Sequence, residues 1–259
     1  MRAGGASAIG YIPIFTTAVA LAFTAVLWRR YRERGGMHLL WWGIGTLTYA
    51  LGTTTESLTT LFGWQEAVFR AWYITGALLG GAPLAQGTVY LLFSRRTANR
   101  MTLLAGAFIA VAATCTLLSP INYSLVEPYH LTGKVLAWQW VRRFSPFINL
   151  YAVTFLIGGA ILSAVRYRRR RETRHRYLGN VCIAVGALLP GIGGAFTRFG
   201  HTEVLYVTEL LGLLTIYLGY RFNTRVTTET ALPGTARDRS GEPVPRPDPP
   251  ALPRSPART

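Results

Sequence analysis

Two glutamates inside apolar stretches are the residues best placed for chemistry in this sequence. Glu56 follows Tyr49 and Thr53 at intervals of seven and three residues, and Thr60 continues the row after four more. Residues at this spacing share one face of a helix, so that face is polar within an otherwise apolar run. Such a face turns toward protein or water rather than lipid. These residues therefore predict a polar pocket or a structural ion pair.

Arg70 is the predicted partner of Glu56. The turn between their two apolar runs is centred near 63–66. At ~1.5 Å per helical residue, both side chains would lie roughly 5–10 Å below the same end of antiparallel neighbours. An isolated charge at the bilayer centre costs a few kcal/mol, so opposite charges at similar depth are expected to pair. The pair is interpreted as a structural clip or as the floor of an outward-facing pocket.

Glu209 is the second buried candidate. Tyr206 and Leu213 fall on the same helical face as Glu209, and Arg198 precedes that helix in an outer turn. Glu209 is expected to be neutral through burial or to pair with an arginine.

Several small residues are placed for close contact between helices. Glycines let neighbouring backbones approach, whereas proline frees a carbonyl and bends the axis. Packing is the favoured interpretation and a hinge is the alternative. The residues are Gly76, Gly80, Gly186, Pro190 and Gly193.

The elements that must position these residues are long apolar runs. Half of the 259 residues are apolar or aromatic and only 15% are charged. A bilayer core needs about 20 apolar residues as helix. The sequence thus predicts an all-α polytopic membrane protein, a bundle of seven transmembrane helices. The predicted spans are 8–28, 39–62, 67–93, 101–119, 146–165, 177–197 and 203–222.

Arginines in the connections predict the orientation. Those after the first, third and fifth runs are strongly basic, and the alternate connections carry few cations. Because positive residues stay inside, the N-terminus is expected outside and the C-terminus in the cytoplasm, for a multi-pass protein of the inner (plasma) membrane. The net charge of +16 is assigned to lipid headgroups, so the expected partner is the bilayer and not nucleic acid.

The longest outer connection, 120–145, contains Trp138 and Trp140 beside Arg142 and Arg143. Paired tryptophans flanked by arginines suit a short helix at the headgroup level. We interpret this segment as an interfacial anchor, with a ligand lid as the alternative.

Residues 226–259 differ from the predicted seven-helix domain at 1–225. They are rich in proline and contain no apolar run, so they predict a disordered cytoplasmic tail. The prolines at 247, 250, 253 and 256 recur every third residue, as in polyproline II, which leaves a proline-reading partner as an alternative role.

No motif for phosphate binding, zinc hydrolysis or a serine nucleophile occurs in the sequence. The four histidines fall near the predicted ends of spans, not at one depth within the bilayer, so no haem or metal site is expected. We therefore predict no catalytic residue, metal or cofactor.

Two resemblances bear on the fold. VRRFSPFINLYAVTFLIGGAILSA at 141–164, together with 178–222, resembles uncharacterised bacterial seven-helix integral membrane proteins. LLWWGIGTLTYALGTTTESL at 39–58 is distantly similar to the seven-helix membrane sensor modules of some bacterial histidine kinases. Those modules are followed by kinase domains, whereas this chain continues into a short tail. The resemblance implies that a signal would pass to a separate signalling or membrane protein partner.

These observations favour a receptor-like or ligand-sensing module with an outward-facing polar pocket. The alternatives are a membrane-complex subunit or assembly factor, a small transporter, and a lipid-acting membrane enzyme. The enzyme hypothesis has only Glu56 and Glu209 as acid and base, without a metal motif or nucleophile.

Overall fold

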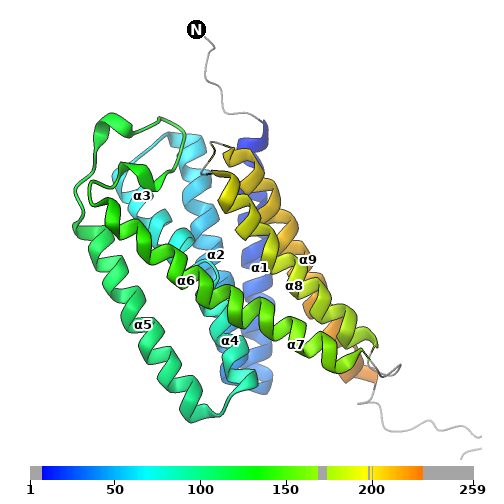
Figure 1. The fold of residues 1–259 in the computed structure, drawn as a ribbon. Helices are drawn as coiled ribbons and strands as arrows, with labels where there is room; N and C mark the ends of the chain where they lie inside the picture. Colours follow the sequence, from blue (N-terminus) through cyan, green and yellow to red (C-terminus); the bar gives the residue numbers. More distant parts are fainter. Residues whose placement is uncertain (1–7, 169–173, 198, 200, 230–259) are drawn as a thin grey trace, which may run out of the picture. The chain divides into compact units, whose positions relative to one another are not determined.

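The computed structural model describes residues 8–168, 174–197, 199 and 201–229, with the backbone alone at 8 and 225–229. These residues form helices joined by short connections, and no strand occurs among them beyond two isolated bridges near 121–136 (Figure 1). The predicted all-helical class is confirmed. The predicted disordered tail at 226–259 is wrong at its start, because the last helix continues to Glu229. The rest of that tail, 230–259, lies outside the described residues.

The first two long helices form an antiparallel pair. Helix α1 (Ile12–Arg34) follows a short 3-10 turn and is joined to α2 (Met37–Phe62) through Gly35 and Gly36. Both glycines have positive φ, 66° and 100°, a backbone conformation that side chains disfavour. The tight reversal therefore depends on glycine and places α1 along α2.

The third predicted helix, 67–93, is interrupted rather than continuous. It consists of α3 (Glu66–Trp72), a π-helical segment (Tyr73–Leu78) and α4 (Ala82–Leu92), with a non-helical step between the last two. Gly80 and Gly81 occupy that step, and Pro83 follows in the first turn of α4. Proline has no N–H for the preceding turn, and glycine weakens a helix, so the break falls where local sequence is least helical.

The remaining helices complete the described fold. After α5 comes a loop with three short 3-10 helices, the last of which leads directly into α6. A π-helical segment (Val153–Ile157) joins α6 to α7. The bounds are α5 (Arg95–Leu118), α6 (Phe144–Ala152), α7 (Gly158–Tyr167), α8 (Arg174–Thr197) and α9 (Thr202–Glu229).

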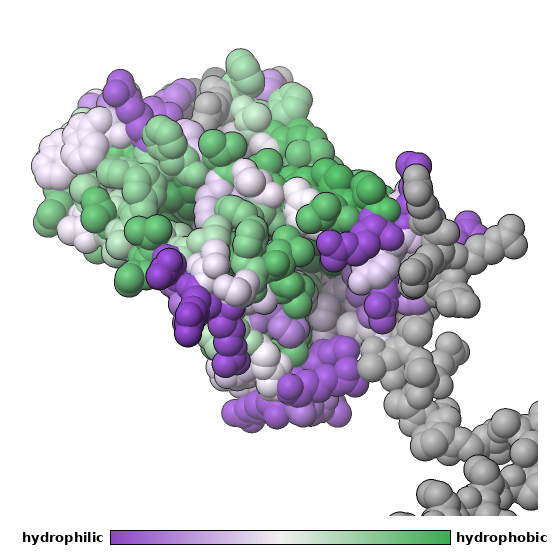
Figure 2. All heavy atoms as spheres, turned by 60° about the horizontal axis from the view of Figure 1, so that its bottom comes forward, coloured by the Kyte–Doolittle hydropathy of each residue, from purple (hydrophilic) through white to green (hydrophobic). Residues whose placement is uncertain are grey.

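Within the described residues, five helices are long and apolar enough to cross a membrane. They are Ile9–Arg34, Arg95–Leu118, Gln139–Tyr167, Arg174–Thr197 and Thr202–Thr224. Helix α2 has the length but carries many threonines, and the α3–α4 region is broken. Figure 2 shows a broad apolar surface, with hydrophilic residues in patches toward the end that Figure 1 draws at the bottom. The seven-crossing count stays a prediction.

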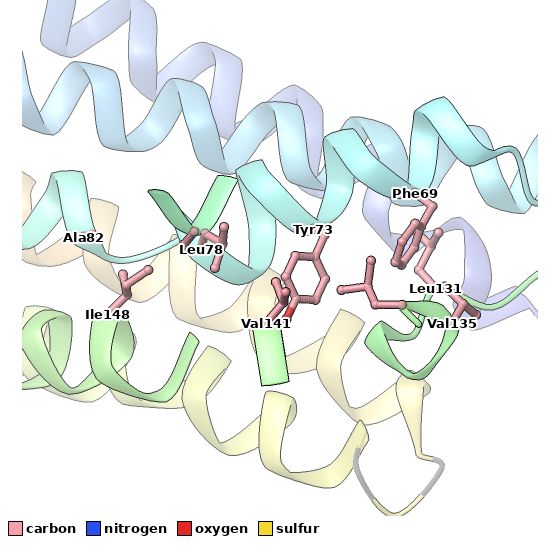
Figure 3. Close-up of a cluster of buried hydrophobic side chains, with 10 residues drawn as sticks. Phe69, Tyr73, Leu78, Ala82, Leu131, Val135, Val141 and Ile148 are labelled. Atoms are coloured by element: carbon pink, nitrogen blue, oxygen red, sulfur yellow. The ribbon is translucent and has the colours of Figure 1, made fainter. Parts of the chain in front are cut away.

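The long connection after α5 packs against α3 and the π-helical segment that follows it. Leu131, Val135 and Val141 from this connection pack around Tyr73 and beside Phe69 in one buried cluster (Figure 3). The predicted short helix at Trp138–Arg143 exists as a 3-10 helix, Gln139–Arg143. Because its buried side chains belong to this cluster, the connection is anchored to the helices by apolar packing.

Candidate functional site: a buried carboxyl pair

The polar face predicted on α2 is turned toward other helices. Thr53 hydrogen-bonds Thr17 of α1 at 2.8 Å, and the Thr60 hydroxyl donates to the Gly10 carbonyl at 3.1 Å. Threonine hydroxyls also donate hydrogen bonds to backbone carbonyls of their own helix, so these polar groups have partners in an apolar setting. The threonine block therefore joins α2 to α1 and its preceding turn.

Glu56 lies on this face with only 3% of its surface exposed. Its Oε1 accepts a hydrogen bond from the Trp72 indole Nε1 at 3.0 Å. Trp72 is the last residue of α3, just before the π-helical segment. This hydrogen bond therefore joins α2 to the end of α3.

Glu209 meets Glu56 from α9. The two carboxyl groups lie within hydrogen-bonding reach of each other. Tyr49 holds this contact in place, because its hydroxyl donates to the backbone carbonyl of Glu209 at 3.0 Å. Tyr206, one turn before Glu209, is also buried and has both carboxyls as electrostatic neighbours. The structure therefore brings together Tyr49, Glu56, Tyr206 and Glu209, which the sequence divides between two distant helices.

Each of these carboxyls keeps one buried oxygen without a donor. Neither Oε2, of Glu56 or of Glu209, has a hydrogen-bond partner in the described part of the chain. Among the described residues, neither carboxyl forms an ion pair with arginine, lysine or histidine. Two adjoining carboxylates cannot both be ionised cheaply in an apolar environment. One shared proton would supply the missing donor and remove one negative charge.

The predicted ion pair between Glu56 and Arg70 is wrong. Arg70 instead pairs with Glu66, one turn earlier on α3, through Nη2 at 2.7 Å and Nε at 2.9 Å. The remaining guanidinium bonds reach the carbonyl oxygens at the end of α5, those of Thr116 at 2.5 Å, Leu117 at 2.8 Å and Ser119 at 3.0 Å. A helix end leaves its last carbonyls unpaired and carries partial negative charge. Arg70 is therefore held by a local acid and a helix terminus.

The N-terminal end of α3 forms a second charged cluster around the same arginine. The Tyr123 hydroxyl donates to Glu66 Oε2 at 2.5 Å. This hydrogen bond, together with the one from Arg70, lowers the pKa of Glu66. The same contact raises the pKa of Tyr123, because the hydroxyl proton is held by a carboxylate. The cluster fixes the loop after α5 to the start of α3.

A third polar network lies between α4, α5 and α6 and was not predicted. The Gln86 amide donates to Thr102 Oγ1 at 2.7 Å and to the Ala98 carbonyl at 3.2 Å, and the Tyr151 hydroxyl donates to Gln86 Oε1. Gln86 is the one amide side chain in the mainly apolar run at 82–93. An uncharged amide buried in a span is the signal that could have identified this network.

Helix α6 packs against the interruption between the π-helical segment and α4. Ser145 donates its hydroxyl to the Ala77 carbonyl at 3.0 Å, in the π-helical segment. A methyl group at Gly81 would come within 2.8 Å of the Ala152 Cβ, so α6 also approaches the break itself. π-helical segments occur often at functional sites. The freed backbone is therefore packed against protein.

The glycines predicted for close packing take different places. A methyl group at Gly186 would lie 2.7 Å from the Gly212 carbonyl oxygen, and one at Gly193 would lie 2.8 Å from the Leu205 Cα, so both face α9. Pro190 lies between them and touches Gly212. Gly76 faces Gly52 of α2, whereas Gly80 lies at the break.

Two further observations complete the site. Arg198, considered as a partner for Glu209, lies outside the described residues. In the described part of the chain, no three His, Cys, Asp or Glu side chains gather as metal ligands would.

Comparisons with protein-family models, curated proteins and solved structures found no match to this chain.

Proposed function

We propose that this chain is a receptor-like, ligand-sensing membrane module, and that the carboxyl pair of Glu56 and Glu209 is its sensing site. In this proposal α2 and the broken α3–α4 region cross the membrane together with the five apolar helices. The N-terminus then lies outside and the C-terminus in the cytoplasm. The pair binds one proton at rest and exchanges it for a small cationic ligand.

The observation that carries this proposal is a pair of neighbouring carboxyls, each of which has one buried oxygen without a hydrogen-bond partner in the described structure. A protein that needed only stability would gain little from two acids here, because burying a charge without a partner is costly. A cation between them would satisfy both oxygens. Ionisable groups inside membrane helices commonly mark ligand or ion sites.

The contacts of the pair suggest how occupancy would be transmitted. Glu56 lies on α2, its donor Trp72 ends α3, and Glu209 lies on α9. A cation would draw α2 and α9 together, whereas loss of the shared proton without a cation would separate them. Helix α9 continues to Glu229, so its displacement would be available to a separate signalling partner on the cytoplasmic side.

Thermal unfolding of the detergent-purified protein tests the proposal with a panel of alkali cations and primary and quaternary amines. One class is expected to raise Tm for the wild-type protein, because a ligand that binds only the folded state stabilises it by mass action. Glu56→Gln and Glu209→Gln are expected to lose this response. Glu203→Gln, on the exposed first turn of α9, is the matched control and should retain it.

An unchanged response in both glutamine variants would exclude the carboxyl pair as the binding site. Mass spectrometry after purification in mild detergent separates the subunit hypothesis. A retained cationic small molecule supports sensing, whereas a stoichiometric protein alone supports a complex subunit.

A small transporter is the second candidate, because the third span is discontinuous between Leu78 and Ala82. Broken helices of this kind bind substrates and ions in secondary transporters. Reconstitution into liposomes distinguishes the two functions. A transporter would carry the stabilising cation across the membrane, whereas a sensing module would bind it without flux.

A further inference from the structure

The structure contains an apolar groove apart from the carboxyl pair. It has a volume of about 710 Å³ and lies between α5 and α6, next to the start of α4. Its walls are aliphatic and aromatic, with Leu104 and Phe108 on one side and Phe147 and Phe155 on the other. The volume falls in the range of sites that hold one small molecule, ~300–1,000 Å³.

The groove exists because α5 is held only toward its two ends. Among its 24 residues, the buried ones are Ala98 near the start and Ala112 and Thr116 near the end. Between them the helix packs loosely, and Leu103 and Leu104 are 73% and 71% exposed. Figure 1 shows α5 standing apart from its neighbours along this stretch. The open wall is therefore a feature of the helix arrangement rather than of one side chain.

One charged side chain, Arg143, lines this groove. Arg143 is exposed, and among the described residues its guanidinium forms no ion pair and no hydrogen bond. Two acids of the described region have other partners, since Glu66 of α3 pairs with Arg70 and Glu127 of the loop after α5 pairs with His130. The groove thus combines a long apolar wall with one uncompensated positive charge.

Aromatic residues mark the same end of the groove. Trp140 lines it and stacks on Trp138, with ring centroids 6.0 Å apart and planes 19° apart. Amphipathic indole rings settle where headgroups meet acyl chains. Arg143 and Trp140 would therefore lie at headgroup depth, with the apolar wall reaching from there into the hydrocarbon.

We propose that this groove binds one anionic phospholipid, with its phosphate on Arg143 and an acyl chain between α5 and α6. A guanidinium binds a phosphate through parallel N–H donors, a geometry that suits its planar fork. The apolar wall favours a ligand that carries a long hydrocarbon chain. A helix with side chains is ~10 Å across, so this volume would hold less than two of its turns, which disfavours a peptide occupant.

An occupied groove would also reach the broken span. Tyr151 lines the groove, and its hydroxyl is the donor to Gln86 of α4. Ala82, the first residue of α4, lines it as well. The acyl chain would thus rest against the step between the π-helical segment and α4, and would brace α5 against it.

Native mass spectrometry after reconstitution in nanodiscs tests the site. The discs contain one part phosphatidylglycerol to four parts phosphatidylcholine, and retained lipid is counted per protein. We expect one phosphatidylglycerol per wild-type chain, in preference to phosphatidylcholine. Arg143→Gln is expected to lower this retention about fivefold, the effect of one cation near an anionic surface. Arg142→Gln is the matched control, because Arg142 bonds Gln139 and does not line the groove.

Two more variants test the acyl chain separately from the charge. Ala105→Phe would fill the groove and lower retention, whereas Ala107→Phe places the same ring on an exposed position of α5 outside the lining. Arg143→Lys keeps the charge and should retain most of the lipid. Equal losses in Arg142→Gln and Arg143→Gln, or equal losses in the two phenylalanine variants, would overturn the proposal. Retention of the two lipids in the one-to-four ratio of the disc would overturn it as well.

Discussion

The indole of Trp72 decides how Glu56 is accommodated at the level of single residues. It is the donor that the structure gives to Glu56 Oε1, at 3.0 Å, in the place where an arginine was predicted. A neutral donor satisfies one oxygen without cancelling the charge. This arrangement leaves the carboxyl dependent on Glu209 and on a proton or cation, which is the physical basis of the proposed function.

Replacing Trp72 with phenylalanine is expected to destabilise the fold by about 1–3 kcal/mol, because Glu56 Oε1 loses its donor in a buried setting. Trp41→Phe is the matched control on α2, since the Trp41 Nε1 is buried without a partner in the described structure. Unfolding in a mixed-detergent titration gives both values. Equal losses in the two variants would show that ring volume, and not the hydrogen bond, matters.

Glu66 provides a pH-dependent contact with the loop after α5. Hydrogen bonds from Tyr123 and Arg70 lower its pKa in the folded state. A lowered folded-state pKa contributes stability that is complete above the ordinary value of 4.5 and is lost as the pH falls through the folded value. The contact between the loop and α3 is therefore expected to persist at neutral pH and to weaken in acid.

Tyr123→Phe tests this contact. The Tyr123 hydrogen bond lowers the Glu66 pKa more than the Arg70 hydrogen bond does. Its loss should therefore move the Glu66 pKa back toward its ordinary value. The carboxyl ¹³C shift of labelled Glu66, titrated in detergent micelles, measures it. An identical titration in the variant would contradict the assigned cause, and Tyr129→Phe, on an exposed tyrosine of the same loop, controls for general loop effects.

Glycine contacts decide the approach of α8 and α9 at the level of elements. Gly179, Gly186 and Gly193 recur every seven residues along α8, and each faces α9 at a distance that leaves no room for a side chain. Because these glycines are used within the chain, they do not provide a free docking surface. Two glycines between α3 and α4 have different roles. Gly76 allows close contact with α2, and Gly80 lies at the interruption of the helix.

Gly186→Ala is expected to destabilise the fold by about 1–3 kcal/mol, since its methyl group would lie 2.7 Å from the Gly212 carbonyl oxygen and force the helices apart. Gly191→Ala is the control on the same helix, where a methyl group meets nothing within 4 Å. That change should be neutral or slightly stabilising, because alanine favours helix. Thermal unfolding of the two variants compares them. A Gly186→Ala protein as stable as Gly191→Ala would show that α8 and α9 are not in close contact.

The number of membrane crossings determines the arrangement of the whole molecule. Five crossings by the apolar helices and seven crossings both put the termini on opposite sides, so tags at the ends cannot distinguish them. The connection between α2 and α3 can. With seven crossings it lies outside, and with five it lies on the same side as the connection before α5.

A single cysteine at Gln65 is therefore expected to react with a membrane-impermeant maleimide added to intact cells. Gln65 is exposed, and Cys115→Ala with Cys182→Ala removes the native thiols. Thr97→Cys, at an exposed position in the first turn of α5, is the control that should react only after the membrane is opened. Protection of both positions would establish five crossings, and labelling of Thr97→Cys alone would reverse the orientation.

The sequence by itself determined the helical class, most helix positions and the polar character of Glu56 and Glu209. Apolar length and helical periodicity are local properties, and they show which residues share a face of one helix. The tertiary structure alone decided the partners across helices. Arg70 had Glu66 within one turn and the end of α5 beside it, so it never needed Glu56. Glu56 met Glu209 because packing sets the rotation and approach of α2 and α9, and these depend on contacts among residues far apart in the chain.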